Sequence, residues 1–146
     1  MGRRPTVSIL MNCLNGARYL QGALTSVCAQ TYTDWEVIFY DSGSTDGSVD
    51  IAKTYGKKVR VFQGPPVPLG EARNLALAKA RGTYLAILDC DDRWAPCNLE
   101  ALVHDMEHDP RIGVAYSDAV WTVPRYPYPA LLCGANFLAS SSLVFR

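Results

Sequence analysis

Apolar runs and helical periodicities alternate along the chain, separated by short polar segments. Residues 6–11 form an apolar run rich in β-prone residues, and the turn-forming segment 12–16 follows it. Leu20, Leu24 and Val27 then recur at helical spacing, with Cys28 beside them. This order predicts a strand, a polar loop and an amphipathic helix.

The same unit recurs further along the chain. Residues 35–40 predict a second strand, and the polar loop 41–47 follows it. Ser44 or Thr45 is the expected N-cap of a helix carrying Val49, Ala52 and Tyr55. The remaining predicted elements are a strand at 59–62, a helix at 71–80 that stops at Gly82, a strand at 84–88, a helix after Pro96 that ends near residues 109–110, and strands at 112–116 and 140–145.

This alternation predicts an α/β fold with a mostly parallel sheet covered by helices on both faces. Strands this apolar leave no face for water, and helical crossovers between parallel strands supply the cover. In such sheets, ligands bind beyond the carboxyl ends of the strands. The polar segments 12–15, 41–47 and 89–92 follow three of the predicted strands. We therefore expect them to form one site at that edge.

Composition fits a single globular domain over residues 1–146. Hydrophobic residues make up 49% and charged residues 19%, which excludes a mainly disordered chain. Fourteen basic residues balance fourteen acidic ones, and the basic clusters at 3–4 and 57–60 contain no aromatic residue, so nucleic acid is not an expected partner. The first residues do not lead into a signal peptide. The expected location is cytoplasmic, with peripheral binding at the inner membrane face as an option.

The uncharged segment 126–145 contains two prolines, an asparagine and three consecutive serines, which predicts a loop and a buried strand instead of a membrane helix. The five cysteines are odd in number and form no CxxC pair, which fits neither a disulfide framework nor a zinc site. We interpret them as small buried residues in a reducing compartment. His104 and His108 are four residues apart without a zinc-protease pattern between them, and are expected on the polar face of a helix.

An acidic turn follows the predicted strand at 84–88. Asp89, Asp91 and Asp92 place three carboxylates within four residues, and their mutual repulsion requires solvent or a cation. Oxygen ligands of this kind suit Mg²⁺ or Mn²⁺. The alternative is a solvated acidic turn that caps the next helix.

Two further positions are candidates for ligand binding. Asp41 ends a predicted strand and is followed by small residues that allow close approach of a ligand, although an N-cap with loop glycines explains the same pattern. Arg73 can pair with a phosphate, a base or a strand-end aspartate, or form a surface salt bridge. Neither a Gly-x-Gly-x-x-Gly fingerprint nor a Walker loop is present, which argues against dinucleotide oxidoreductases and phosphate-loop ATPases.

Four segments resemble family 2 glycosyltransferases of the GT-A (Rossmann-like) fold. They are 7–16, 41–47, 70–74 and 88–92, with 29–32 as a supporting match. The resemblance implies an enzyme that binds a nucleotide-diphosphate sugar and transfers the sugar with inversion, using Mn²⁺ or Mg²⁺. It implies that Asp41 contacts the nucleoside together with Ser42, that Arg73 frames the base, and that Asp89 and Asp91 form a D-x-D metal pair. The residues implied to frame the base from the first loop are Asn12, Leu14 and Asn15.

The resemblance also implies partners and a missing part. The acceptor is a glycan, lipid or protein, as in the biosynthesis of cell-surface polysaccharides. In the family an acceptor-binding half with an acidic catalytic base follows a strand like 132–146, so this chain is expected to carry mainly the donor-binding half, with the catalytic base unidentified. An exposed seam left by that half would allow a homo-oligomer. Many family members have Tyr at the position of Leu14, and leucine lacks the aromatic stacking on a base.

Two other interpretations stay open. The chain is alternatively a non-catalytic module that binds nucleotide sugars or regulates another protein. A cytidylyl- or uridylyl-transferase would need a lysine in the loop after the first strand, and residues 12–16 contain none.

Overall fold

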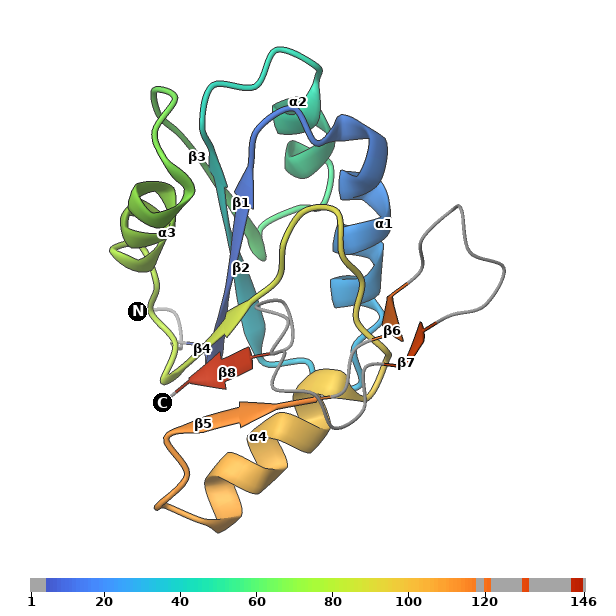
Figure 1. Ribbon diagram of the computed structural model, residues 1–146, viewed down its shortest axis with the longest axis vertical. Coiled ribbons are helices and arrows are strands. Elements are labelled where there is room, and N and C mark those ends of the chain that lie inside the picture. The colour runs from blue at the N-terminus through green and yellow to red at the C-terminus, as the bar shows by residue number, and fades with distance from the viewer. Residues whose placement is uncertain (1–4, 118–119, 122–129, 132–142, 146) are drawn as a thin grey trace.

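The computed structural model describes residues 5–117, 120–121, 130–131 and 143–145 (Figure 1). The helices are α1 (Ala17–Cys28), α2 (Ser48–Lys53), α3 (Leu69–Leu77) and α4 (Asn98–His108). The strands are β1 (Val7–Cys13), β2 (Trp35–Asp41), β3 (Val59–Gln63), β4 (Tyr84–Ile87), β5 (Val114–Tyr116), β6 (Val120–Trp121), β7 (Ala130–Leu131) and β8 (Leu143–Phe145).

The main sheet has the strand order β3-β2-β1-β4-β8-β5, and β6 and β7 form a separate antiparallel pair. β3, β2, β1 and β4 run parallel, whereas β8 is antiparallel to both of its neighbours, β4 and β5. This confirms the predicted mostly parallel α/β sheet. Crossover helices connect the four parallel strands, as the alternating pattern required.

Helices cover both faces of the parallel strands. Figure 1 shows α3 on one side of the sheet and α1 with α2 on the other. Successive side chains of a strand point to opposite faces. On β1, Ile9 and Met11 therefore join the larger core with α1 and α4, while Leu10 packs in a second core with Ala72 and Ala76 of α3. Burial on both faces explains why these strands read as continuous apolar runs.

Most predicted elements form, with shifted ends. β1 continues through Asn12 and Cys13, which were expected in the turn, because both residues pair with β2. α3 begins at Leu69 and ends at Leu77, earlier than predicted at both ends. Pro68, with extended backbone, marks the point where the chain turns into this helix.

The predicted N-cap of α2 is wrong. Gly47, with a left-handed φ of 87°, occupies the cap position without a side-chain cap hydrogen bond. Ser44 and Thr45 instead contact Asn15 in the preceding loop. Tyr55 lies beyond the end of this short helix and its hydroxyl reaches α1.

The interpretation of every cysteine as buried is also wrong. Cys13 is buried and Cys90 is partly buried, but Cys28 and Cys97 are exposed, and these four are free thiols. Cys133 and most of 126–145 lie outside the described residues, although β8 supplies a strand near the predicted one. Neither β6 nor β7 was predicted.

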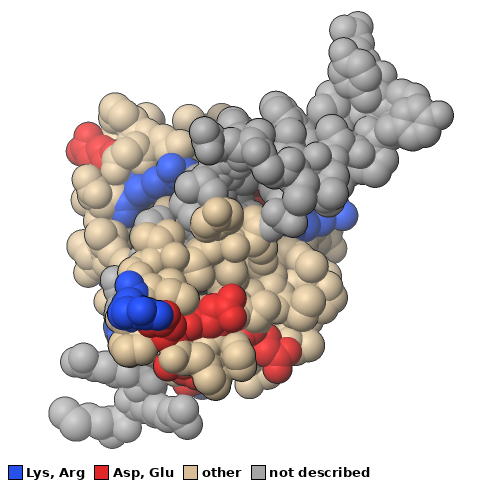
Figure 2. Space-filling model, turned by 60° about the horizontal axis from the view of Figure 1, so that its bottom comes forward, with Lys and Arg blue, Asp and Glu red and all other residues tan. Residues whose placement is uncertain are grey.

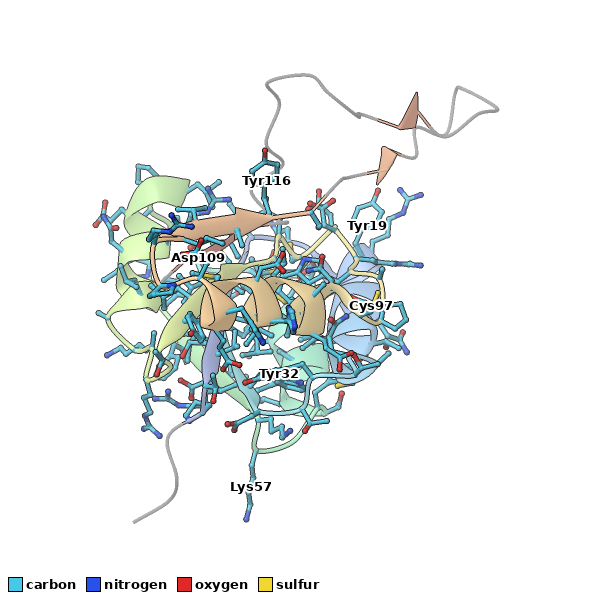
Figure 3. The ribbon with its side chains drawn as sticks, turned by 90° about the horizontal axis from the view of Figure 1, so that it is seen from below. Tyr19, Tyr32, Lys57, Cys97, Asp109 and Tyr116 are labelled. Carbon is cyan, nitrogen blue, oxygen red and sulfur yellow. The ribbon has the colours of Figure 1, made fainter. Side chains whose placement is uncertain are left out.

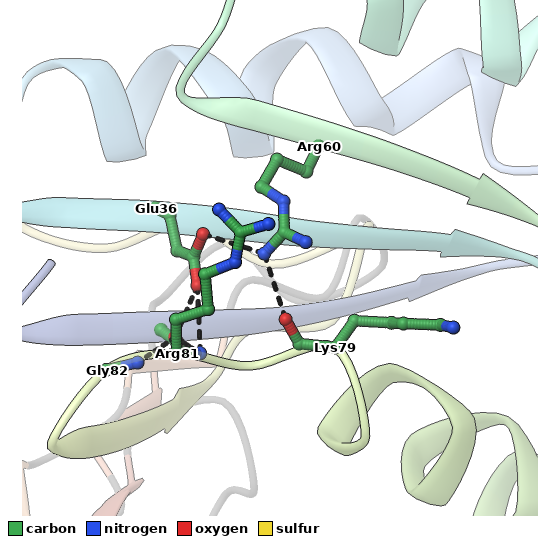
Figure 4. A network of polar contacts seen from close by, with 6 residues as sticks. Glu36, Arg60, Lys79, Arg81 and Gly82 are labelled. Carbon is green, nitrogen blue, oxygen red and sulfur yellow. Dashed lines mark hydrogen bonds and ion pairs between the residues drawn. The ribbon is translucent and has the colours of Figure 1, made fainter. Parts of the chain in front are cut away.

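The amino ends of the strands meet in a polar network, shown in Figure 4. Glu36 on β2 is almost fully buried and accepts hydrogen bonds from Ser8 Oγ (2.8 Å), the Arg81 backbone N–H (3.1 Å) and Arg60 Nη1 (2.9 Å). Ser8 Oγ in turn accepts from the backbone N–H groups of Arg81 and Gly82. We call Ser8, Glu36, Arg60, Arg81 and Gly82 the amino-end network.

The outer surface carries mixed charge. The face in Figure 2 shows acidic and basic side chains side by side over the lower part of the molecule. Glu100, Asp105 and Glu107 of α4 are exposed. Tyr116 on β5 is 60% exposed and points away from the body in Figure 3. His104 and His108 stack on the exposed side of α4, with ring centroids 3.9 Å apart, as expected for a polar helix face. No helix among the described residues is long and apolar enough to cross a membrane.

Candidate functional site

The polar segments that follow β1, β2 and β4 gather at one edge of the sheet. β1 lies between β2 and β4, with Cys13 in register with Asp41 on β2. On its other side, β1 pairs with β4 through Leu10 and Ile87. The acidic turn at 89–92 therefore leaves the sheet beside the end of β1. In Figure 1 the loop after β4 arches past that end. We call this region the carboxyl edge.

Hydrogen bonds join the loop after β1 to the loop after β2. The Asn15 N–H donates to Ser44 Oγ (2.8 Å), and the Thr45 N–H donates to Asn15 Oδ1 (2.9 Å). Asn15 itself has a left-handed φ of 54°, a conformation that asparagine tolerates better than most residues. Asn15, predicted to contact a nucleotide, thus joins these two loops through its backbone N–H and its side-chain oxygen.

A side chain of the loop after β2 caps the first turn of α1. Asp46 Oδ2 accepts from the Ala17 N–H at 2.8 Å, and Asp46 Oδ1 accepts from the Ser48 hydroxyl. These hydrogen bonds, from Ser48 first and then from Ala17, lower the pKa of Asp46. The carboxylate is also favoured at the positive end of the helix dipole. Asp46 thus fixes the loop that follows Asp41.

Asp41 is the most enclosed carboxylate of this edge. Its exposed fraction is 0%, and its Oδ2 accepts from the N–H groups of Gly43 (3.1 Å) and Ser44 (3.0 Å). Its Oδ1 is buried and has no hydrogen-bond partner within the described part of the chain. The same holds for Nδ2 of Asn12, in the adjacent strand. Buried polar atoms without a partner are rare and require an explanation such as an absent water or ligand.

Ser42 and Leu14 differ in how they face this edge. Ser42 is buried and its N–H donates to the Cys13 carbonyl at 2.9 Å, which extends the pairing of β1 with β2. Leu14 is 56% exposed. An exposed leucine beside polar loops offers an apolar surface to a flat ligand without aromatic stacking.

Arg73 reaches the acidic turn from α3. Its Nη2 lies 2.9 Å from Asp89 Oδ1, and both side chains are about a quarter to a third exposed, at 27% and 31%. Arg73 was expected to pair with a phosphate, a base or a strand-end aspartate, or to form a surface salt bridge. The structure shows the pairing with a strand-end aspartate, Asp89. Asp91 and Asp92 are exposed.

The donor set fits a substrate-bridging cation better than a closed metal site. No group of three or more His, Cys, Asp or Glu side chains that could hold a metal ion occurs among the residues described. Mg²⁺ binds proteins through one or two carboxylates and takes its other ligands from water and phosphates. Asp91, exposed, and Asp89, oriented by Arg73, match that need.

A thiol pair adjoins the acidic turn and was missed by the sequence analysis. The Cys90 side chain hydrogen-bonds to that of Cys13, and this contact lowers the pKa of Cys13 to about 7. The same contact, followed by burial, raises the pKa of Cys90. The sequence signal was faint, since only the β1–β4 register brings residues this far apart together.

Comparison with known proteins identifies the family. The sequence profile of Glycosyl transferase family 2 matches residues 8–132, so the chain belongs to this family. It is 34% identical over 114 residues to an uncharacterized glycosyltransferase of Nostoc sp., covering 75% of this chain and 35% of that protein. It is 37% identical over 101 residues to the putative teichuronic acid biosynthesis glycosyltransferase TuaG of Bacillus subtilis, covering 66% of this chain and 40% of that protein.

A third relative matches nearly the full chain. An uncharacterized glycosyltransferase of Haemophilus influenzae is 33% identical over 161 aligned positions, covering 97% of this chain and 63% of that protein. The chain therefore spans between about a third and two thirds of the length of these relatives.

Solved structures support the GT-A fold. Staphylococcus aureus TarS in complex with UDP matches 97% of this chain and 46% of its own, with a TM-score of 0.79 at 20% identity. The mannosyltransferase PcManGT of Pyrobaculum calidifontis, in complex with GDP-Man and Mn²⁺, matches 77% of this chain and 35% of its own, with a TM-score of 0.69 at 26% identity. The predicted fold class is confirmed.

Proposed function

We propose that this chain binds the donor of a glycosyl transfer, a nucleotide-diphosphate sugar, together with Mn²⁺ or Mg²⁺ at the carboxyl edge. The whole protein then transfers the sugar to an acceptor with inversion at the anomeric carbon. Membership of Glycosyl transferase family 2 supports the transfer, and the complexes of PcManGT with GDP-Man and Mn²⁺ and of TarS with UDP support the ligand class.

The observation that carries the proposal is the unpaired oxygen of Asp41. A buried carboxylate oxygen without a donor costs about 1–3 kcal/mol or more, because charged groups lose the most on desolvation. A ribose hydroxyl or a base N–H would supply that donor. Asn12 Nδ2 needs an acceptor at the same edge, and a base carbonyl would provide one. Leu14 would pack against the base.

Asp89 and Asp91 are the residues that would hold the metal. When bound, a divalent cation neutralises charge on the departing nucleoside diphosphate. Arg73 fixes the orientation of Asp89 through their ion pair and brings a positive charge to the place where the phosphates would lie. The loops held by Asn15 and Asp46 keep Asp41 in place before the ligand arrives.

We assign no catalytic base and no acceptor. Asp118, which follows the predicted strand at 112–116, lies outside the described residues and outside the segments that resemble the family. The acceptor class, a glycan, lipid or protein, and a role in making cell-surface polysaccharide remain parts of the proposal. General-base catalysis contributes typically about 10²–10⁴-fold, so donor binding and sugar transfer are separable properties.

Isothermal titration calorimetry with UDP and with GDP, each with and without Mn²⁺, tests donor binding. We expect one of the two nucleotides to bind with a Kd between about 1 µM and 1 mM, the usual range for enzyme substrates, and to bind more weakly when the metal is chelated. Sugar release from UDP-GlcNAc and GDP-Man then distinguishes an enzyme from a module that only binds.

Asp91→Asn tests the metal site within the same measurement. Removing this charge is expected to abolish most of the gain in nucleotide affinity that Mn²⁺ provides, about tenfold or more, since a hard cation prefers a charged oxygen ligand. The matched control is Asp105→Asn on α4, a carboxylate that is 63% exposed and away from this edge. Equal metal dependence in both variants would refute the assignment of Asp91.

A further inference from the structure

The thiol of Cys13, at the end of β1, meets the thiol of Cys90, which lies within the acidic turn. A Cβ placed on Gly16 would lie 2.8 Å from Cys13 Sγ and 2.8 Å from Cys90 Sγ, so the two sulfur atoms flank a single point. Cys13 is buried and Cys90 is partly buried. Because Gly16 has no side chain, nothing from that position separates the two sulfurs.

The register of the sheet explains why these thiols meet. Leu10 pairs with Ile87, and the Leu88 N–H donates to the Leu10 carbonyl at 3.1 Å, so the chain stays alongside β1 beyond the last residue of β4. Cys90 lies three residues beyond the end of β4, in the turn that this pairing holds beside the end of β1.

The surroundings of Cys13 favour its oxidation first. Cys13 lies just before α1, and its contact with Cys90, together with the nearby Ser48 and Ser44 hydroxyls and the Gly16 N–H, lowers the pKa of Cys13 although burial opposes the shift. Donors of this kind at a helix N-terminus stabilise a thiolate, the form of cysteine that reacts with oxidants. Cys28 and Cys97 are exposed but stand apart from the pair.

We propose that Cys13 and Cys90 form a reversible disulfide, made by peroxide, that ties the acidic turn to the end of β1. In the first step the Cys13 sulfur attacks one peroxide oxygen, the O–O bond breaks, and a sulfenic acid and water result. In the second step the Cys90 sulfur attacks the Cys13 sulfur, the S–S bond forms, and the S–O bond breaks to release a second water. Two electrons pass from the thiol pair to the peroxide.

The disulfide would act on the donor site, and this part rests on the proposed function. Cys90 is the residue between Asp89 and Asp91. Drawing its sulfur into a covalent bond with Cys13 moves the backbone that joins the two carboxylates and alters their common orientation. We therefore expect the oxidised protein to bind nucleotide with Mn²⁺ at least tenfold more weakly than the reduced protein, with recovery after dithiothreitol.

Peptide mapping tests the disulfide without reference to any ligand. Trypsin releases Cys13 in peptide 4–18 and Cys90 in peptide 82–93, each with a single cysteine. In a variant with Cys28, Cys97 and Cys133 replaced by serine, hydrogen peroxide should link these two peptides at a mass two hydrogens below their sum. Dithiothreitol should separate them. Failure to link them in the folded protein, or an equal yield in protein unfolded by guanidinium, overturns the proposal.

Calorimetry with UDP and GDP in the presence of Mn²⁺ tests the consequence. Cys13→Ser and Cys90→Ser should each keep the same nucleotide affinity before and after peroxide, whereas the parent loses it. Unchanged affinity in a parent sample that is fully cross-linked overturns the regulatory part. If the reduced parent binds neither nucleotide, the proposed function fails, and the peptide map still decides whether the disulfide exists.

Discussion

Each end of β2 carries one buried carboxylate, and the two carboxylates differ in how many of their oxygens accept hydrogen bonds. Glu36, the second residue of the strand, has both oxygens hydrogen-bonded, and one of them receives the Arg60 guanidinium. Asp41, the last residue, is more deeply buried, yet only its Oδ2 accepts hydrogen bonds among the described residues. One strand thus holds a completed network at its amino end and an incomplete one at its carboxyl end.

This difference separates stability from binding. A buried carboxylate whose oxygens are all paired contributes to the folded state, and removing a partner leaves a costly orphan. A buried carboxylate with one oxygen that accepts no hydrogen bond can accept one from a bound ligand. We infer that the amino-end network stabilises the folded state, whereas the carboxyl edge binds a ligand.

The largest expected loss of stability comes from Gly82→Ala in the amino-end network. A Cβ at Gly82 would lie 2.5 Å from the backbone nitrogen of Ser8 and 2.8 Å from the carbonyl carbon of Val7. Backbone cannot move aside like a flexible side chain, so β1 and the 81–83 turn must separate. We expect the free energy of unfolding to fall by about 3 kcal/mol, the upper part of the usual overpacking range.

Gly70→Ala is the matched control for that substitution. Gly70 lies in the first turn of α3, and a Cβ there would meet no atom within 4 Å. Alanine is favoured over glycine in a helix by about 0.5–1 kcal/mol, so urea denaturation should show equal or higher stability. An equal loss of stability in both variants would show that the close packing of Gly82 against the backbone of β1 is not what stabilises the amino-end network.

Glu36→Gln is expected to cost less, about 2 kcal/mol. The amide keeps the shape but presents N–H groups where Glu36 now accepts from Arg60, and hydrogen bonds to charged groups are worth about 1.5–3 kcal/mol. Asp50→Asn is the control, because the Asp50 side chain is 87% exposed and lies 3.9 Å from Lys53. Urea denaturation should show a change within about 0.5 kcal/mol for that surface pair. Comparable losses in both variants would contradict the role given to Glu36.

Much of this architecture follows from local pattern. The apolar runs predicted the four parallel strands, and the rule that parallel strands end at the same edge brought the polar loops with Asp41 and Asp89 together. These predictions succeed because burial and chain connectivity act on neighbouring residues. The prediction of the N-cap of α2 was wrong because Ser44 and Thr45 form hydrogen bonds with Asn15, a residue from another loop.

The rest depends on pairings between distant residues. Ser8 joins Arg81 and Glu36 joins Arg60 only after β1, β2 and β3 are in register, and Cys13 meets Cys90 only through the pairing of β1 with β4. One signal was available, since a glutamate inside the apolar run 35–40 needs a partner once the strand is buried on both faces. The sequence did not indicate which basic side chain would be the partner of this glutamate.

The measurement that most directly tests the division between the two ends of β2 is the stability and nucleotide affinity of Asp41→Asn, side by side with Glu36→Gln. The amide oxygen of the introduced asparagine can keep the hydrogen bonds from Gly43 and Ser44, so the free energy of unfolding should stay within about 1 kcal/mol of the parent value. Affinity for UDP or GDP with Mn²⁺ should fall at least tenfold, about 1.4 kcal/mol. Glu36→Gln should show the reverse, a loss of stability with affinity retained. Parent-like nucleotide affinity in Asp41→Asn, or a loss of stability equal to that of Glu36→Gln, would contradict the account.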